Sequence, residues 1–151
     1  MSFDNQHMRS ALENALYAQV ANEVPVGAVI VMRNTDKIIA TGYNRVEIDA
    51  NPTKHAEMIA IESACKILQS KNLSACDLYV TLEPCTMCAA AISYARIGRL
   101  FYGAKDPKQG AVEHGARFFT QETCMHRPEI YDGIMSVEAS AIMKIFFENL
   151  R

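Results

Sequence analysis

Apolar residues recur along the chain with two different spacings, and each spacing predicts a different element. Around residues 4–21 they return every three or four positions, which places them on one face of a helix. Residues 26–32, VGAVIVM, form a continuous run rich in valine, which predicts a strand buried on both faces. The polar stretch RNTDK then turns the chain, so residues 37–43 are expected to pair with this strand as a hairpin.

Helical and strand patterns alternate through the rest of the chain. They predict a helix at about 55–69, a strand at 77–82, a helix at 85–95, a strand at 98–103, a long loop at 104–128, a short strand at 129–132 and a helix at 136–150. A hairpin followed by strand–helix–strand crossovers gives a mixed sheet with helices on both faces. We therefore predict an α/β fold, a three-layer α/β/α sandwich with about five strands, as one domain spanning residues 1–151.

The composition narrows the class of protein. Half of the 151 residues are hydrophobic, yet no apolar run approaches the roughly 20 residues that a membrane-spanning helix needs. The first residues, MSFDNQHMRS, lack the apolar stretch of a signal peptide, so we expect a cytoplasmic protein. Five cysteines without a secretion signal favour metal binding or catalysis over a disulfide framework. The net charge of −2 gives no basic footprint, so nucleic-acid binding would have to rest on particular residues.

The segment TLEPCTMC, residues 81–88, carries the strongest candidate chemistry. Cys85 and Cys88 directly follow Pro84 at the start of a predicted helix, three positions apart and therefore on one helical face. The unpaired N–H groups and the positive dipole at a helix N-terminus stabilise thiolates over thiols. The pair therefore predicts two soft, anionic metal ligands.

The stretch KHAEMIA, residues 54–60, supplies His55 at the start of another predicted helix. With Cys85 and Cys88 it completes a three-ligand set for Zn²⁺ that leaves the fourth position for water. We predict one zinc ion per chain, held between two helix N-termini. Glu57 lies two positions beyond His55, so it can stand beside the metal without ligating it. A buried carboxylate there could take a proton from the water and pass it to a substrate nitrogen.

Each motif also has a simpler interpretation. Cysteine is often a buried core residue, and a lone histidine at a helix start is commonly a cap or a satisfied polar group. A structural zinc site would need a fourth protein ligand, which Cys124, His126 or His114 in the predicted loop region could supply. Cys65 lies too far along its predicted helix for that role, and Cys76 is expected to be a small buried residue before a strand.

Taken together, H-A-E followed by P-C-x-x-C resembles the zinc-dependent cytidine and nucleobase deaminase superfamily. Further segments are similar to bacterial tRNA adenosine deaminases: EVPVGAVIV, GYNR, PTKHAE, SYARIGRLFYGAKDPKQGA and HRPEIYDGI, in family order over nearly the whole chain. The two metal motifs are shared across the superfamily. The EVPVGAV, GAKDPKQGA and HRPEI segments are more particular to the tRNA branch.

This resemblance implies a cytidine deaminase-like fold, a homodimer, and hydrolytic deamination of the wobble adenosine in a tRNA anticodon loop to inosine. Glu57 would then move the protons. The likeness also assigns four residues to the substrate, Asn44, Val26, Asp106 and Phe147. Each has a structural interpretation as well. Val26 suits a buried strand, Asn44 a turn and Asp106 a helix cap, while Phe147 could simply pack in the core.

Two other functions are compatible with the same residues. A free-base or nucleoside deaminase, for guanine or cytosine, would use the same metal chemistry. A non-catalytic, zinc-stabilised binding domain would need a closed metal site and would have no use for Glu57. The residues after the FF pair, ENLR, hold a single arginine, so phosphate contacts are expected from scattered residues such as Arg45, Lys54, Lys105, Lys108, Arg117 and Arg127. His114 is either a substrate contact or a loop residue.

Overall fold

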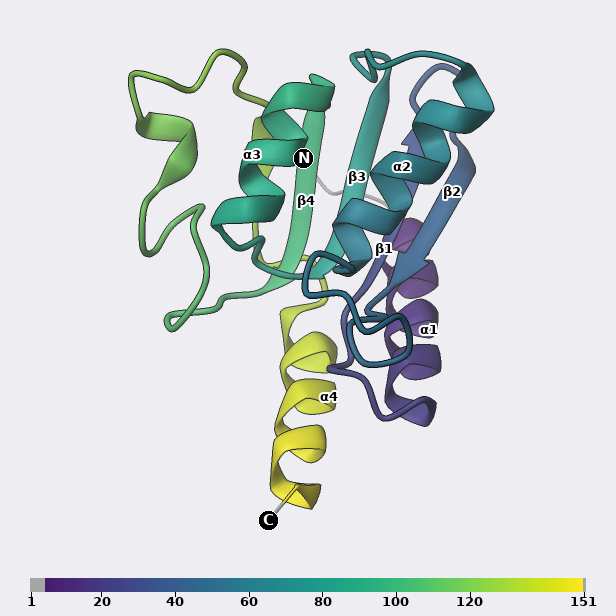
Figure 1. Cartoon of the computed structure of the whole chain (residues 1–151), viewed down its shortest axis with the longest axis vertical. Helices are drawn as coiled ribbons and strands as arrows, with labels where there is room; N and C mark the ends of the chain where they lie inside the picture. The colour runs from purple at the N-terminus through teal and green to yellow at the C-terminus, as the bar shows by residue number, and fades with distance from the viewer. Residues whose placement is uncertain (1–4, 151) are drawn as a thin grey trace.

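A computed structural model of the chain, which describes residues 5–150, contains a central five-stranded sheet with helices on both faces (Figure 1). The helices are α1 (Gln6–Val20), α2 (Ala56–Leu68), α3 (Thr86–Ala95) and α4 (Ser136–Asn149), with a short 3-10 turn, η1 (Phe118–Thr120). The strands are β1 (Gly27–Met32), β2 (Lys37–Tyr43), β3 (Cys76–Leu82), β4 (Arg99–Ala104) and β5 (Glu129–Tyr131). All predicted elements are present within one or two residues of their expected ends. The predicted start of the first helix, position 4, lies outside the described residues.

The sheet is mixed, as predicted. Its strand order is β2-β1-β3-β4-β5. Strand β1 runs antiparallel to both β2 and β3, whereas β3, β4 and β5 are parallel to one another. Helix α3 makes the crossover between β3 and β4, and the long segment 105–128 connects β4 to β5. In Figure 1 this segment, in green, lies beside α3 at one edge of the molecule.

Two hydrophobic cores confirm the three-layer α/β/α arrangement. Along β1, Ala28 and Ile30 belong to the core under α2 and α3, whereas Val29 and Val31 belong to the core under α1 and α4. All four are buried, so the continuous apolar run does form a strand covered on both faces. The alternation follows from the geometry of a strand, in which successive side chains point to opposite faces.

Two helix starts lie near the same end of the sheet. Strand β3 leads into α3 at its carboxyl end, and α2 begins near the same end of the sheet (Figure 1). Helix α2 packs closely on β2 at Gly42, where an added Cβ would lie 2.4 Å from the carbonyl oxygen of Ala56. Only glycine permits this approach, because a side chain would push the first turn of α2 away from the sheet.

Helix α4 differs from the other helices in how little of it is buried. Ala139 is its one residue classed as fully buried, and the helix extends beyond the sheet toward the C-terminus (Figure 1). None of the helices within residues 5–150 combines the length and the apolar character needed to cross a lipid bilayer.

Paired substitutions of isoleucine on neighbouring strands test this arrangement. Ile30 is fully buried on β1, while Ile38 on the edge strand β2 is 36% exposed. We expect Ile30→Ala to lower the free energy of unfolding by about 2–5 kcal/mol, because it leaves a cavity between packed layers. The control, Ile38→Ala, should cost less than about 1 kcal/mol. Urea unfolding of both variants measures the difference, and equal losses would contradict the described burial.

Candidate active site

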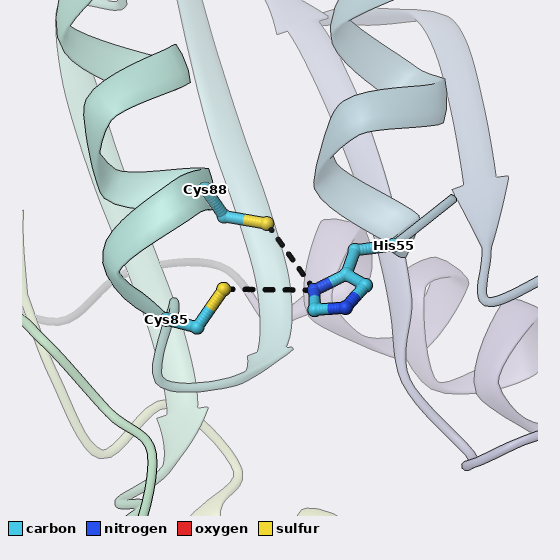
Figure 2. Close-up of side chains that lie close together, drawn as sticks. All are labelled: His55, Cys85 and Cys88. Carbon is cyan, nitrogen blue, oxygen red and sulfur yellow. Dashed lines mark hydrogen bonds between the residues drawn. The ribbon is translucent and has the colours of Figure 1, made fainter. Parts of the chain in front are cut away.

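Three predicted metal ligands lie together at the carboxyl end of β3. The side chains of His55, Cys85 and Cys88 point toward one another from the starts of α2 and α3 (Figure 2). The Nδ1 atom of His55 lies 3.6 Å from the sulfur of Cys85 and 3.5 Å from that of Cys88. All three donor atoms lie within 4.8 Å of one another. The histidine therefore presents Nδ1 to the thiols, with Nε2 on the opposite edge of the ring.

The spacing of these donors fits a tetrahedral zinc ion. Zinc binds cysteine sulfur at about 2.3 Å and histidine nitrogen at about 2.0–2.1 Å, and in a tetrahedron these lengths separate nitrogen from sulfur by about 3.6 Å. The distances from His55 to both sulfurs agree with that value. One imidazole and two thiolates are also a preferred ligand set for zinc, so the residues present fit the metal.

The local backbone explains why the donors meet. His55 and Cys85 are the capping residues immediately before α2 and α3, both in extended conformation, and Cys88 lies in the first turn of α3. Two helix N-termini therefore face the same point and favour anionic sulfur there. The side-chain oxygen of Asn44 accepts a hydrogen bond of 2.8 Å from the backbone N–H of Ala56. This contact fixes the first turn of α2 against the loop after β2.

The pKa values of the two thiols are shifted in opposite directions. The pKa of Cys85 is lowered to about 4, chiefly by a hydrogen bond from Cys88 and further by His55. The pKa of Cys88 is raised, first by its bond to the Cys85 thiolate and then by burial. The pKa of His55 is raised by its hydrogen bond with Cys85. Metal ligation requires both sulfurs deprotonated and the imidazole neutral, so binding a cation here would release protons.

Glu57 lies beside this cluster, in the first turn of α2, and is only 4% exposed. Burial raises the pKa of its carboxyl group to about 7. A carboxyl group with a pKa near neutrality can both accept and return a proton at physiological pH. Its position and its acidity are those required of a proton carrier next to a metal.

A pocket of about 920 Å³ opens over the cluster. His55, Glu57 and Cys85 line it, together with all four residues that the family resemblance assigned to the substrate: Val26, Asn44, Asp106 and Phe147. The structure thus brings residues from six separate segments of the chain to one cavity. Cys88 is fully buried behind the pocket.

The structural interpretations of the four residues also hold in part. Val26 is buried just before β1, and Asn44 caps the first turn of α2. A carboxylate oxygen of Asp106 accepts hydrogen bonds of 3.1 Å from the backbone N–H groups of Lys108 and Gln109. Phe147 is 48% exposed on α4, so core packing does not account for it.

The candidate fourth ligands lie elsewhere. The thiol of Cys124 donates to the carbonyl oxygen of His126 and contacts Ser93 on α3. The ring of His126 bonds to the carbonyl oxygen of Ile97, and that of His114 bonds to Glu83. Each of these side chains therefore has a different partner, and the cluster remains open toward the pocket.

Sequence reasoning missed two buried carboxylates that line the same pocket, Glu23 and Glu83. Glu23 accepts hydrogen bonds from the backbone N–H groups of Glu47 and Ile48. Glu83 accepts several from the segment after β4, which hold its pKa below the ordinary value although burial opposes ionisation. The available signal was a charged residue placed directly next to an apolar run, in EVPVGAV and in TLEPC.

Known proteins share both the sequence and the fold of the chain. Residues 1–104 match the family model of the cytidine and deoxycytidylate deaminase zinc-binding region. Over 144 residues, covering 95% of this chain and 99% of the relative, the chain is 56% identical to a tRNA-specific adenosine deaminase of Rickettsia bellii (strain RML369-C). The chain belongs to the tRNA-specific adenosine deaminase family. The family member of Bacillus subtilis (strain 168) is 37% identical over 151 residues, which are 100% of this chain and 92% of that protein.

Solved structures extend the likeness. One, from a study of A-to-I editing by tRNA:A34 deaminases at the wobble position of transfer RNA, has a TM-score of 0.89 and 50% identity, covering 92% of this chain and 99% of that one. A guanine deaminase from Nitrosomonas europaea has a TM-score of 0.80 at 25% identity, covering 97% and 85%. The resemblance to tRNA adenosine deaminases is therefore confirmed, and the fold is shared with deaminases of free bases.

Replacing one thiol tests whether His55, Cys85 and Cys88 bind a zinc ion. We expect Cys85→Ser to bind much less than one equivalent of zinc, because a serine hydroxyl does not substitute for a thiolate ligand. Cys65→Ser is the matched control, since Cys65 is a free thiol on α2 outside the cluster. Elemental analysis of the purified proteins measures the zinc content. Full zinc occupancy in Cys85→Ser would contradict the assignment.

Proposed function

We propose that this protein hydrolytically deaminates the wobble adenosine of a tRNA anticodon loop to inosine, with one zinc ion per chain held by His55, Cys85 and Cys88. A single observation carries the proposal. The three donors fit zinc, remain open on the pocket side, and have the buried carboxyl group of Glu57 beside them. A relative that is 56% identical is a tRNA-specific adenosine deaminase, which supports this substrate.

Glu57 performs the proton transfers of the proposed reaction. When bound, zinc supplies Lewis acidity that lowers the pKa of a coordinated water toward about 7. The net reaction replaces the amino group at C6 of adenine with oxygen from water and releases ammonia. The carboxylate of Glu57 takes a proton from the attacking water and delivers it to the leaving nitrogen, which departs as ammonia. Its pKa of about 7 suits both directions of this exchange.

Asn44 orients the base in this proposal. Its side-chain oxygen is held by the backbone N–H of Ala56, which leaves the amide NH₂ group as a donor for a ring nitrogen of the purine. Val26 forms an apolar wall of the same pocket. A base must leave its stack to reach a recessed metal, and this costs least in an unpaired loop.

Asp106 and Phe147 are proposed to meet the nucleotides beside the flipped base. Both line the pocket, and Phe147 is half-exposed with its ring at 79° to that of Phe146. RNA loops are recognised through splayed bases that stack on aromatic side chains. An exposed aromatic side chain on the pocket lining suits a loop substrate better than a free base, which needs no contact beyond the pocket.

Deamination of guanine or cytosine is the alternative, and the likeness to guanine deaminases is its support. Incubation with an anticodon stem-loop bearing a wobble adenosine, and separately with free adenosine, cytidine and guanine, distinguishes the two. We expect inosine in the stem-loop only. Turnover confined to the free compounds would replace the proposal with the alternative.

Substitution of Glu57 separates catalysis from a purely structural metal site. We expect Glu57→Gln to lower the rate of inosine formation by at least about 10²-fold, because the amide cannot transfer protons. Zinc content should be unchanged. Glu62→Gln is the matched control, because Glu62 lies on the same helix with an exposed carboxyl group paired to lysines. Wild-type activity in Glu57→Gln would favour a non-catalytic, zinc-stabilised binding domain.

A homodimer is also part of the proposal, as the family resemblance implies. The outer face of α2 and α3 carries exposed apolar side chains, including Ile67 and Tyr94, the latter 83% exposed. A groove lined by Ile61, Cys65 and Ala91 lies beside Tyr94 on the same face. A tRNA substrate further implies action in the cytoplasm.

Sedimentation velocity tests the assembly. We expect a species of twice the 16.8 kDa chain mass, and Tyr94→Ser should shift it toward the monomer because it removes a large apolar contact. Val137→Ser, which replaces another exposed apolar residue on α4, is the control and should leave the dimer intact. A wild-type protein that sediments as a monomer at micromolar concentration would contradict the proposal.

A further inference from the structure

Glu83 occupies an unusual position between β3 and the metal ligands. Its side chain is 0% exposed, and it immediately precedes Pro84 and Cys85. Isolated carboxylates are not buried without compensation, because desolvation disfavours the charge. The structure therefore has to supply donors for both oxygens of Glu83.

The donors all come from the segment that follows β4. One oxygen accepts from the backbone N–H of Asp106 at 3.0 Å and contacts the ring Nδ1 of His114 at 2.9 Å. The other accepts from three consecutive backbone N–H groups, those of Val112, Glu113 and His114, at 3.0–3.2 Å. A single side chain thus holds both ends of the segment 106–114.

The backbone of this segment also contacts the metal-ligand turn directly. The N–H of Ala111 donates to the carbonyl oxygen of Pro84 at 2.8 Å, and Gly110 forms an isolated β-bridge with Cys85. An added Cβ at Gly110 would lie 2.5 Å from the carboxyl group of Glu83. Glycine is therefore required where the segment crosses the carboxylate.

The same segment forms one wall of the pocket. Its residues Lys105, Asp106, Lys108 and Gln109 line the cavity above the metal cluster. Because Glu83 is joined to Cys85 through one proline, the carboxylate links the position of this wall to the position of a metal ligand. Displacement of the segment would move Asp106 relative to the metal.

Asp77, a buried carboxylate at the other end of β3, has a purely structural role and serves as a comparison for Glu83. Asp77 is as buried as Glu83, but its partners are the guanidinium groups of Arg33 and Arg99, which join β3 to its neighbours in the sheet. It does not line the pocket. Charge neutralisation by arginine stabilises the contacts of β3 with its neighbouring strands, whereas Glu83 binds the backbone of one pocket wall.

We propose that Glu83 is a positioning residue that sets Asp106 and the adjoining wall against the metal cluster, so that recognition of the RNA loop depends on it. The inference rests on the proposed function. It assigns to Glu83 no contact with the reacting atoms, since its side chain is fully buried and acts through Asp106.

A double-mutant cycle tests the link between Glu83 and Asp106. We expect Glu83→Gln to lower kcat/KM for the wobble-adenosine stem-loop at least about 10-fold, mainly through KM, with zinc content unchanged. Asp106→Asn, which keeps a capping side chain, should also raise KM in the wild-type background. In the Glu83→Gln background it should have almost no further effect, because the wall is already displaced. Such non-additivity, of about 5-fold or more, indicates coupled residues.

Two further variants keep the test independent of folding losses. Gly110→Ala should reproduce the effect of Glu83→Gln, because it pushes the same segment off an intact carboxylate. Asp77→Asn is the control for a lost buried charge. Its effect on kcat/KM for the stem-loop should be additive with the effect of Asp106→Asn. Hydrogen exchange adds a readout that needs no turnover. Glu83→Gln, but not Asp77→Asn, should speed exchange at the amides of Val112, Glu113 and His114.

The outcomes separate the inference from the proposed function. Additive effects of Glu83→Gln and Asp106→Asn in an active enzyme would overturn the inference alone, as would unchanged exchange in the segment 106–114. Absence of inosine formation by the wild-type protein would overturn the proposed function and this inference together.

Discussion

The convergence of two helix N-termini at one end of the sheet is the constraint on which the site depends. Helix α2 reaches that point because Gly42 lets it lie against β2. Helix α3 reaches it because the short connection after the end of β3 at Leu82, which contains Pro84, leads into the capping residue Cys85. Both helix ends present unpaired N–H groups, so anionic sulfur is stabilised where His55 completes the donor set. The cluster of His55, Cys85 and Cys88 is thus a product of the sheet topology, and the pocket opens over it.

Most of the fold could be predicted from the spacing of apolar residues. The valine-rich run of β1 indicated burial on both faces, and the two cores on either side of Val29 and Ile30 are its direct result. That His55, Cys85 and Cys88 meet could also be anticipated, because the identity and spacing of the two cysteines favour a shared ligand set. The two cysteines lie at the start of α3, the crossover helix between β3 and β4. The alternation of predicted strands and helices already implied this crossover.

The remaining parts of the site could not be predicted because they depend on contacts distant in sequence. Glu83 carries no local pattern that reveals its partners, which lie beyond β4, and Glu23 likewise bonds to a loop that follows β2. The segment 105–128 has no periodicity, so its path along α3 follows from hydrogen bonds such as that from His126 to Ser93. The structure places Val26, Asn44, Asp106 and Phe147 at one pocket, but only the family likeness had singled them out.

The order of these parts along the chain has a consequence for biosynthesis. All three sulfur and nitrogen donors lie between residues 55 and 88, whereas Phe147 belongs to the last helix. A ribosome therefore completes the donor set while a large part of the pocket is still untranslated. The cluster that we propose to bind zinc can therefore assemble from β1–β3, α2 and α3 before the chain of α4, which carries Phe147, has been synthesised.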